Sequence, residues 1–215
     1  MTLVFPAHQP VTLPVVGSDK RFPLHRIYCV GRNYNDHVKE MGGVVGRDPP
    51  FFFAKPNDAI VLDGRFPYPA MSSDVHHELE LVVALGPDAK VFGYAVGIDF
   101  TRRDLQAEAK KLGRAWETAK AFDFSAPVSA ITPNAAYLEQ ASMSLSVNGT
   151  RRQSSDVKEM IWSVREIIEA LGQYFILKPG DIIFTGTPAG VGAVQRGDTL
   201  HAEIDGVGAL DVVVV

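Results

Sequence analysis

The chain has 215 residues, of which 46% are hydrophobic and 21% charged, and its formal net charge is −4. This weakly acidic composition offers no basic face for nucleic acid. A single cysteine, Cys29, excludes an internal disulfide and a zinc cluster built from cysteines. Cys29 lies in the apolar run 27–30, where we expect a small buried side chain.

Targeting signals are not evident in the sequence. No apolar run approaches the length needed to cross a membrane, and residues 1–14 lack the charged start and apolar core of a secretion signal. We therefore expect a soluble, cytoplasmic protein. Residues 1–25 are expected to form an N-terminal arm on a single catalytic domain that spans residues 1–215.

The first predicted helix is short, from residue 35 to residue 41, and ends at Gly42-Gly43. His37 and Glu40 are three residues apart and share a face of it. Glu40 can orient the imidazole, so that His37 accepts a proton from water near neutral pH. For this pattern alone, a surface pair is the alternative interpretation.

The segment 76–83 has the composition of a buried strand that carries two carboxylates. Glu78 and Glu80 point to the same face of a strand, and two desolvated carboxylates side by side need a cation. All-oxygen ligands favour Mg²⁺, Mn²⁺ or Ca²⁺. The alternative is a solvent-facing edge strand. His76 shares this face, which leaves open a His/carboxylate iron or manganese site, but we favour supporting or packing roles for His76 and His77.

The next predicted strand, 94–99, ends in a candidate third ligand. Asp99 lies where a strand end holds a side chain rigidly while it faces a cleft. Asp99 as a helix cap is one alternative, and Asp104 as the ligand is a weaker one. A helix over 103–112 follows and ends at Gly113.

The second half of the chain is predicted to be rich in β-structure. Asn148-Gly149 indicates a hairpin between residues 145–147 and 150–153. Residues 182–185 are predicted to form a strand, and residues 201–215 a closing hairpin with its turn at Asp205-Gly206.

One longer helix is predicted over residues 157–171. Asp156 is its expected cap, with Glu159 completing a capping box, and Gly172 is its expected end. Strand runs with a few inserted helices predict an α+β fold with a mixed or mostly antiparallel sheet.

Several motifs in chain order resemble the fumarylacetoacetate hydrolase family, from about residue 26 to residue 215. They are Gly31-Arg32-Asn33-Tyr34, Lys55-Pro56, His76-His77-Glu78-Leu79-Glu80, Gly97-Ile98-Asp99-Phe100-Thr101-Arg102-Arg103-Asp104-Leu105-Gln106, Ala119-Lys120 and Thr185-Gly186-Thr187-Pro188-Ala189-Gly190-Val191-Gly192. The segments 51–56 and 120–127 are similar to the small bacterial acylpyruvate and fumarylpyruvate hydrolases of this family.

The resemblance implies a rolled mixed β-structure with a few peripheral helices, an active site in the roll, and a homodimer. It also implies that Glu78, Glu80 and Asp99 bind one Mg²⁺ or Mn²⁺, and that the segment 33–43 forms a lid carrying the His37–Glu40 pair. One departure is the connection 86–90, which is shorter than in most relatives and affects a surface edge or a dimer contact.

The resemblance gives roles to further residues. Lys120 would lie beside the metal carboxylates and stabilise a developing oxyanion or enolate. Lys55 and Gln106 would contact the substrate or the attacking water. Thr187, in a glycine-rich turn, would bring hydroxyl and backbone donors to the ligand carboxylate, unless that segment is simply a tight turn.

Two arginines are candidates for holding a substrate carboxylate. Arg32 and Arg103 each carry a guanidinium, which binds a carboxylate through two parallel hydrogen bonds.

The expected activity is cleavage of a C–C bond in a 2,4-dioxo acid, with 3-fumarylpyruvate giving fumarate and pyruvate. Oxaloacetate decarboxylation and hydration or isomerisation of a 2-keto acid are alternatives on the same scaffold. A non-catalytic protein that binds 2-keto acids is the alternative from a different class.

Overall fold

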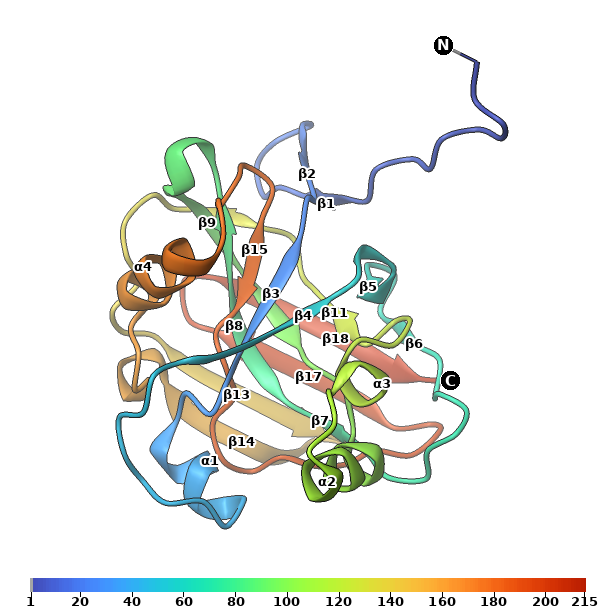
Figure 1. Cartoon of the computed structure of the whole chain (residues 1–215), viewed down its shortest axis with the longest axis vertical. Coiled ribbons are helices and arrows are strands. Elements are labelled where there is room, and N and C mark those ends of the chain that lie inside the picture. The colour runs from blue at the N-terminus through green and yellow to red at the C-terminus, as the bar shows by residue number, and fades with distance from the viewer. Residues whose placement is uncertain (1) are drawn as a thin grey trace.

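The strand β8 (Leu79–Leu85) lies at the centre of the molecule and is buried on both faces. Its odd-numbered side chains, among them Leu81, enter one hydrophobic core, and Val82 and Ala84 enter a second core on the opposite face. The sequence of a strand with two buried faces is a nearly continuous run of apolar residues. Figure 1 shows β8 between the neighbouring strands of its sheet, with the helices at the periphery.

The computed structural model describes residues 2–215 and has one sheet of six strands and one of five. The larger sheet has the spatial order β12 (Thr132–Pro133), β9 (Val91–Ile98), β8, β15 (Ile182–Phe184), β3 (Ile27–Gly31) and β4 (Phe51–Lys55). The second has the order β14 (Thr150–Asp156), β13 (Ser142–Val147), β17 (Thr199–Ile204), β18 (Gly208–Val214) and β6 (Arg65–Phe66). β15 is parallel to β3 and antiparallel to β8, so the larger sheet is mixed.

Smaller sheets and short helices complete the fold. The small sheets are β10 (Thr101–Arg102) with β7 (Val75–His77) and β16 (Gly192–Ala193), β1 (Thr12–Pro14) with β2 (Arg21–Pro23), and β11 (Ala126–Pro127) with β5 (Ile60–Val61). The helices are α1 (Asn35–Glu40), α2 (Arg103–Leu112), α3 (Glu117–Lys120) and α4 (Val164–Tyr174), with 3₁₀ turns η1 (Asn57–Ala59), η2 (Pro87–Ala89) and η3 (Val157–Glu159). The predicted α+β class is confirmed. Within residues 2–215, no helix has the length and apolar character needed to cross a membrane.

The N-terminal segment covers the second core. Leu13 of β1 and Phe22 of β2 are buried there against the even-numbered face of β8. Residues 2–10 extend away from the body of the molecule (Figure 1). The hairpin β1–β2 thus closes one end of the roll, and the metal-site candidates lie at another end of the same face.

Both predicted hairpins are present. Val147 pairs with Thr150 around Asn148-Gly149, and both turn residues have positive φ, which matches the right-handed twist of the strands. In the closing hairpin, Ile204 pairs with Gly208, so the loop has three residues instead of the two that we predicted.

The predicted helix over residues 157–171 is wrong in its first half. Asp156 caps only the 3₁₀ turn η3, and α4 begins later, at a capping box formed by Ser163 and Glu166. Asn33 explains the interruption, because its backbone carbonyl accepts from the Ile161 amide and its side-chain Oδ1 accepts from the next amide. Glu159 makes no capping box, and α4 continues past Gly172 to Tyr174.

The predicted strand 76–83 is interrupted at Glu78. β7 belongs to the three-stranded sheet and β8 to the six-stranded sheet, and Glu78 is the residue between them. The chain therefore changes sheets at the position where the candidate metal site begins.

Candidate active site

Three buried carboxylates meet at the end of β8. Glu78 lies between β7 and β8, Glu80 on β8, and Asp99 directly after β9. The Asp99 amide donates to the Glu78 carbonyl at 2.8 Å, which aligns the two strand ends. One carboxylate oxygen from each residue lies within 4.8 Å of the others, and none of the three side chains is more than slightly exposed.

Two cations hold Glu78 ionised. Lys120 Nζ lies 2.7 Å from Glu78 Oε2, and Arg103 Nη2 lies 2.5 Å from Oε1. Burial would raise the pKa of Glu78, but the charges of Lys120 and Arg103 outweigh it and bring the pKa well below its usual range.

Lys120 also donates to Asp99 Oδ2 at 2.6 Å. Burial would lower the pKa of Lys120, but the charges of Asp99 and Glu78 dominate and raise it above its ordinary value. Lys120 is therefore a permanent ammonium between two carboxylates. Only two of its three N–H groups are used by these bonds.

Glu80 is the carboxylate without a basic partner. Among residues 2–215, no Lys, Arg or His nitrogen lies within 4.0 Å of it, and the donor that it meets is the Gly186 amide at 2.7 Å. Burial, and then the charges of Asp99 and Glu78, raise the pKa of Glu80 well above its ordinary value. A divalent cation at this point would supply the missing charge.

The second carboxylate oxygen of Asp99 also bears on whether a cation fits this site. Asp99 Oδ1 is buried and has no hydrogen-bond partner in the described chain. Lys55 Nζ lies 2.8 Å away, but at an angle outside hydrogen-bond geometry, and it donates instead to Ser125 Oγ and the Lys120 carbonyl. Lys55 thus balances the charge of Oδ1, but no donor in the described chain makes a hydrogen bond to it, and the oxygen set of Glu78, Glu80 and Asp99 fits Mg²⁺ or Mn²⁺, since both ions prefer oxygen donors.

The alternative ligands lie outside this group. His76 is bonded to Asp74, and His77 Nδ1 to Gln153 Oε1. Burial lowers the pKa of His77 to about 4, so its ring is neutral near pH 7. Asp104 instead accepts from Ser72 Oγ.

The helix α1 places the His37–Glu40 pair over the carboxylates. His37 Nδ1 lies 3.1 Å from Glu40 Oε2, and the second Glu40 oxygen accepts from the Gly190 amide at 2.9 Å. Gly190 has φ 97°, and a side chain there would collide with the Arg152 carbonyl. Glu40 therefore joins the lid to the loop after β15, and Nε2 is the ring nitrogen of His37 left for a reactant.

A cleft of about 760 Å³, its open mouth included, lies between α1 and the carboxylates. The polar and charged side chains that line it are Arg32, His37, Glu78, Glu80, Asp99, Arg103, Gln106, Lys110, Lys120 and Thr187. The structure thus brings most of the sequence-predicted site residues to one cavity.

Lys55 does not line this cavity, because its ammonium lies behind Asp99. The structure therefore gives no support to the predicted contact between Lys55 and substrate. Arg103 lines the cavity, but its guanidinium is occupied by Glu78 and by Gln106 Oε1 at 2.7 Å. Thr187 Oγ1 accepts from Gln153 Nε2.

Two buried amides were missed by the sequence analysis. Gln153 of β14 bonds to His77, to the Leu79 amide and to Thr187, and so ties the second sheet to the metal strand. Asn33 bonds to the carbonyls of Trp162 and Thr185. Asn33 lies in the motif Gly31-Arg32-Asn33-Tyr34 but was given no role, and no local pattern marks Gln153, because the partners of both residues are far away in the chain.

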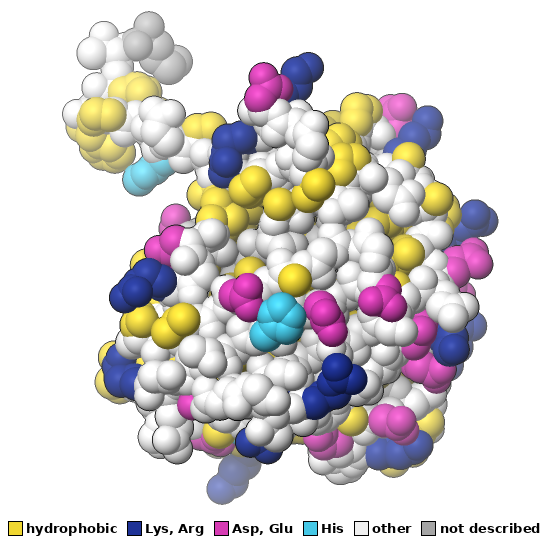
Figure 2. Space-filling view, turned by 180° about the vertical axis from the view of Figure 1, so that it is seen from behind, with side chains coloured by type: hydrophobic (Ala, Val, Ile, Leu, Met, Phe, Trp, Pro, Cys, Tyr) yellow, Lys and Arg dark blue, Asp and Glu magenta, His cyan; other side chains and the backbone are white. Residues whose placement is uncertain are grey.

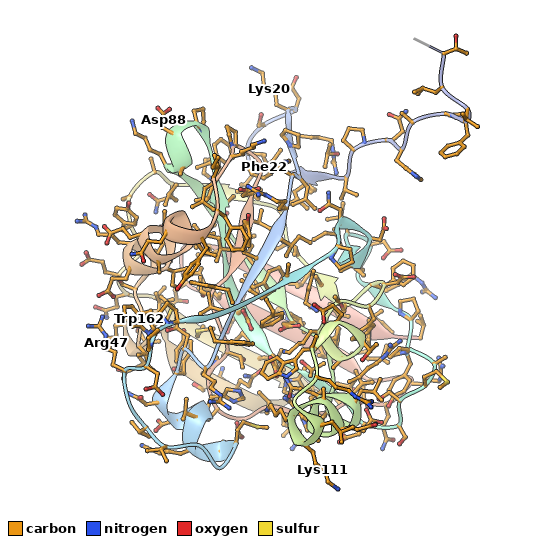
Figure 3. The ribbon with its side chains drawn as sticks, viewed as in Figure 1. Lys20, Phe22, Arg47, Asp88, Lys111 and Trp162 are labelled. Atoms are coloured by element: carbon orange, nitrogen blue, oxygen red, sulfur yellow. The ribbon has the colours of Figure 1, made fainter. Side chains whose placement is uncertain are left out.

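The segment after α1 is fastened to α4. Arg47 forms an ion pair with Glu166, and its guanidinium lies 4.4 Å from the centre of the Trp162 ring. Figure 3 shows Arg47 and Trp162 side by side at the edge of the molecule. Trp162 Nε1 also donates to the Asp48 carbonyl at 3.1 Å. The lid is thus held by the Gly190 amide at Glu40, and the segment that follows it is held by Glu166 and Trp162.

The outer surface carries mixed charges. On the face shown in Figure 2, Lys and Arg side chains are interspersed with Asp and Glu, and no single sign dominates. This agrees with the composition, which offers no extended basic face.

Comparison with known proteins gives a consistent result. The family model described as fumarylacetoacetate hydrolase C-terminal matches residues 26–215. The chain is 40% identical over 200 residues to oxaloacetate tautomerase YcgM of Escherichia coli (strain K12), covering 86% of this chain and 90% of that protein. It is 42% identical over 176 residues to fumarylpyruvate hydrolase of Ralstonia sp, covering 76% and 92%.

Among solved structures, a crystal structure of fumarylpyruvate hydrolase from Pseudomonas aeruginosa, in complex with Mn²⁺ and pyruvate, is similar along its whole length. The TM-score is 0.96 and the identity 46%, with 100% of this chain and 99% of that chain covered. Because the alignment covers nearly all of both chains, that relative has little room for a connection longer than residues 86–90 of this chain.

Proposed function

The chain belongs to the fumarylacetoacetate hydrolase family, and we propose that it is a metal-dependent hydrolase that cleaves 3-fumarylpyruvate into fumarate and pyruvate. The observation that carries the proposal is the opposition of two groups across one cavity. Three carboxylates with Lys120 line one side, and His37 of the lid, held by Glu40, lines the other. The first group suits a 2-keto acid and a divalent cation, and the second suits a water molecule.

Glu78, Glu80 and Asp99 would hold the ion, Mg²⁺ or Mn²⁺. When bound, it would supply Lewis-acid stabilisation of negative charge on the pyruvate part of the substrate. Their burial and mutual repulsion support this assignment, because the group lacks a cation at Glu80.

His37 would take a proton from water through Nε2, while Glu40 orients the ring through Nδ1. The water oxygen then bonds to the C4 carbonyl carbon, and the C3–C4 bond breaks. Its electron pair leaves with C3 as the pyruvate enolate, and a proton returns to C3 to give pyruvate. The acyl part leaves as fumarate.

Lys120 would supply positive charge at the oxyanion that forms on C4. Its ammonium lines the cavity, and its third N–H is not needed by Glu78 or Asp99. A fixed donor in a buried site stabilises developing charge more strongly than water does.

A second candidate is tautomerisation of oxaloacetate. A 40% identical relative is named for this activity. The reaction uses the same binding of a 2-keto acid and moves one proton, with no water added and no C–C bond broken. Oxaloacetate decarboxylation, which gives pyruvate and CO₂, is a further activity to be measured beside it.

The experiment is a substrate panel with one metal ion. Purified protein with Mn²⁺ is incubated with fumarylpyruvate, acetylpyruvate and oxaloacetate, and the products are identified by NMR. We expect fumarate and pyruvate from fumarylpyruvate. Conversion between enol and keto oxaloacetate, with no cleavage of either acylpyruvate, would instead favour the tautomerase.

A homodimer and a cytoplasmic location stay predictions. In support of the first, β4 is an edge strand of the six-stranded sheet and its Phe51 is 45% exposed. An exposed aromatic edge suits coverage by a second copy. Light scattering on the purified protein measures the assembly.

A further inference from the structure

Two cations in the cavity have no acidic partner. Glu78 and Asp99 are matched by Lys120, Arg103 and Lys55. Arg32 and Lys110 also line the cavity, yet no Asp or Glu oxygen lies within 4.0 Å of either among residues 2–215. Both residues are exposed, so their charges stand at the open side of the cavity, where unmatched positive charge favours a ligand with a second negative group.

Lys110 lies at the far end of a row on α2. Arg103, Gln106 and Lys110 follow at spacings of three and four residues and share one helix face. Arg103 holds Glu78 at one end of the row. Lys110 comes seven residues later, so its Cα lies about 10 Å further along the helix axis. The two ends of the row thus present two separate cations to the cavity, Arg103 bound to Glu78 and Lys110 without an acidic partner in the described chain.

Neighbouring groups fix the position of Lys110. Its ammonium lies 5.2 Å from the centre of the Trp116 ring. Partial burial lowers the pKa of Lys110, the nearby charges of Arg103 and Arg32 lower it further, and the charge of Glu78 opposes them. Cations thus outnumber carboxylates around this ammonium, so an incoming carboxylate would be attracted.

The wall between the two ends of the cavity is aromatic and apolar. Phe53 and Trp116 line it with their ring centroids 6.0 Å apart, and Val38 and Met41 of the lid segment face the same space. The cavity's acidic side chains are Glu78, Glu80 and Asp99 alone within the described residues that line it. A planar unsaturated chain packs well on such rings.

We propose that Lys110, together with Arg32, binds the distal carboxylate of the acyl group and makes the enzyme selective for extended 2,4-dioxo diacids over acylpyruvates with a neutral acyl end. This inference rests on the proposed hydrolase function. Oxaloacetate places its second carboxylate close to its keto acid end. Fumarylpyruvate has a longer, planar chain with a carboxylate at its end.

The test compares kcat/KM for fumarylpyruvate and for acetylpyruvate in the wild type, Lys110→Met and Lys111→Met. Lys111 is the matched control, because its side chain points away from the body of the molecule in Figure 3. We expect the ratio of fumarylpyruvate to acetylpyruvate to fall about ten- to hundredfold in Lys110→Met, mainly through KM, since a charged hydrogen bond is lost. Lys111→Met should keep the wild-type ratio.

Lys110→Arg, which retains the charge, should recover part of the selectivity, and circular dichroism checks that each variant is folded. An unchanged ratio in folded Lys110→Met would overturn the inference while leaving the hydrolase intact. A wild type that cleaves neither acylpyruvate would instead overturn the proposed function.

Discussion

The ammonium of Lys55 lies 2.8 Å from Oδ1 of Asp99, and both side chains are completely buried. Lys55 is thus a fixed counter-charge behind the candidate metal ligands, on the side away from the cavity. A buried ion pair resists the removal of one partner, because the other charge is left uncompensated in a poorly solvating interior.

Replacement of Lys55 by Met should therefore destabilise the metal-free protein by about 3–5 kcal/mol. The loss of stability should be smaller when Mn²⁺ is bound, because its charge would offset part of the repulsion among the carboxylates around Asp99. Urea unfolding with chelator and with Mn²⁺ measures both values. Lys90→Met is the control, since the Lys90–Asp88 pair is about 80% exposed, and equal losses in both metal states would contradict the prediction.

Gly186 supports Glu80 through backbone geometry. Its φ of 96° aims the amide at Glu80 Oε2, and a Cβ there would lie 2.7 Å from the Cβ of Asn33. We expect Gly186→Ala to lower the Mn²⁺ affinity about tenfold, as the loss of a group that orients a metal ligand does. Gly197→Ala is the matched control, because Gly197 also has positive φ but open space around it. Similar affinities in the two variants, measured by calorimetry, would argue against a role for the amide.

The lid should depend on Glu40 more than on its exposed neighbours. Glu40→Ala removes both the contact with His37 and the contact with the Gly190 amide, so we expect kcat for hydrolysis to fall about a hundredfold. Asp36→Ala breaks only the exposed pair with Lys39 and should leave kcat near the wild-type value. A steady-state assay of pyruvate release gives both values, and a Glu40→Ala enzyme with normal kcat would remove this pair from the mechanism.

Metal-free stability should depend on pH through Glu80. Its pKa is raised above the ordinary value of 4.5 in the folded chain, so the protonated form stabilises the fold at low pH. This contribution is fully present below 4.5 and is lost as the pH rises through the raised pKa. His77, with its lowered pKa, acts in the opposite direction between its ordinary value of 6.5 and about 4, so a difference between variants is needed.

The measurement is the melting temperature of the metal-free wild type minus that of Glu80→Gln, from about pH 5 to about pH 9. We expect the difference to become more negative as the pH rises, because only the wild type acquires the buried charge. A difference that stays constant over this range would mean that Glu80 is ionised throughout.

The site features that could be predicted from the sequence are those that depend on residues close together in the chain. The spacing of Glu78 and Glu80, and of His37 and Glu40, is local, and the structure brings each pair together. Asp99 follows from its place at the end of a strand. Strand alternation and helix periodicity suggest these pairs, although the predicted strand is broken at Glu78, and the family resemblance supplied the roles.

The failures came from contacts between distant residues. Apolar periodicity favoured a helix from residue 157, but Asn33, far away in the sequence, binds the backbone that this helix would have used. Gln153 carries no local signal for the same reason. The position of Lys55 behind Asp99 depends on the order of strands in the sheet, which the sequence pattern does not specify.

The most direct test of the metal site is a calorimetric titration of Mn²⁺ into metal-free wild type and Glu80→Gln. The amide keeps the size of the side chain and removes the charge that has no basic partner in the described chain. We predict that the wild type binds Mn²⁺ at a single site, and that the folded Glu80→Gln protein binds it at least about tenfold more weakly. The same Mn²⁺ affinity in both proteins would contradict the account of the site.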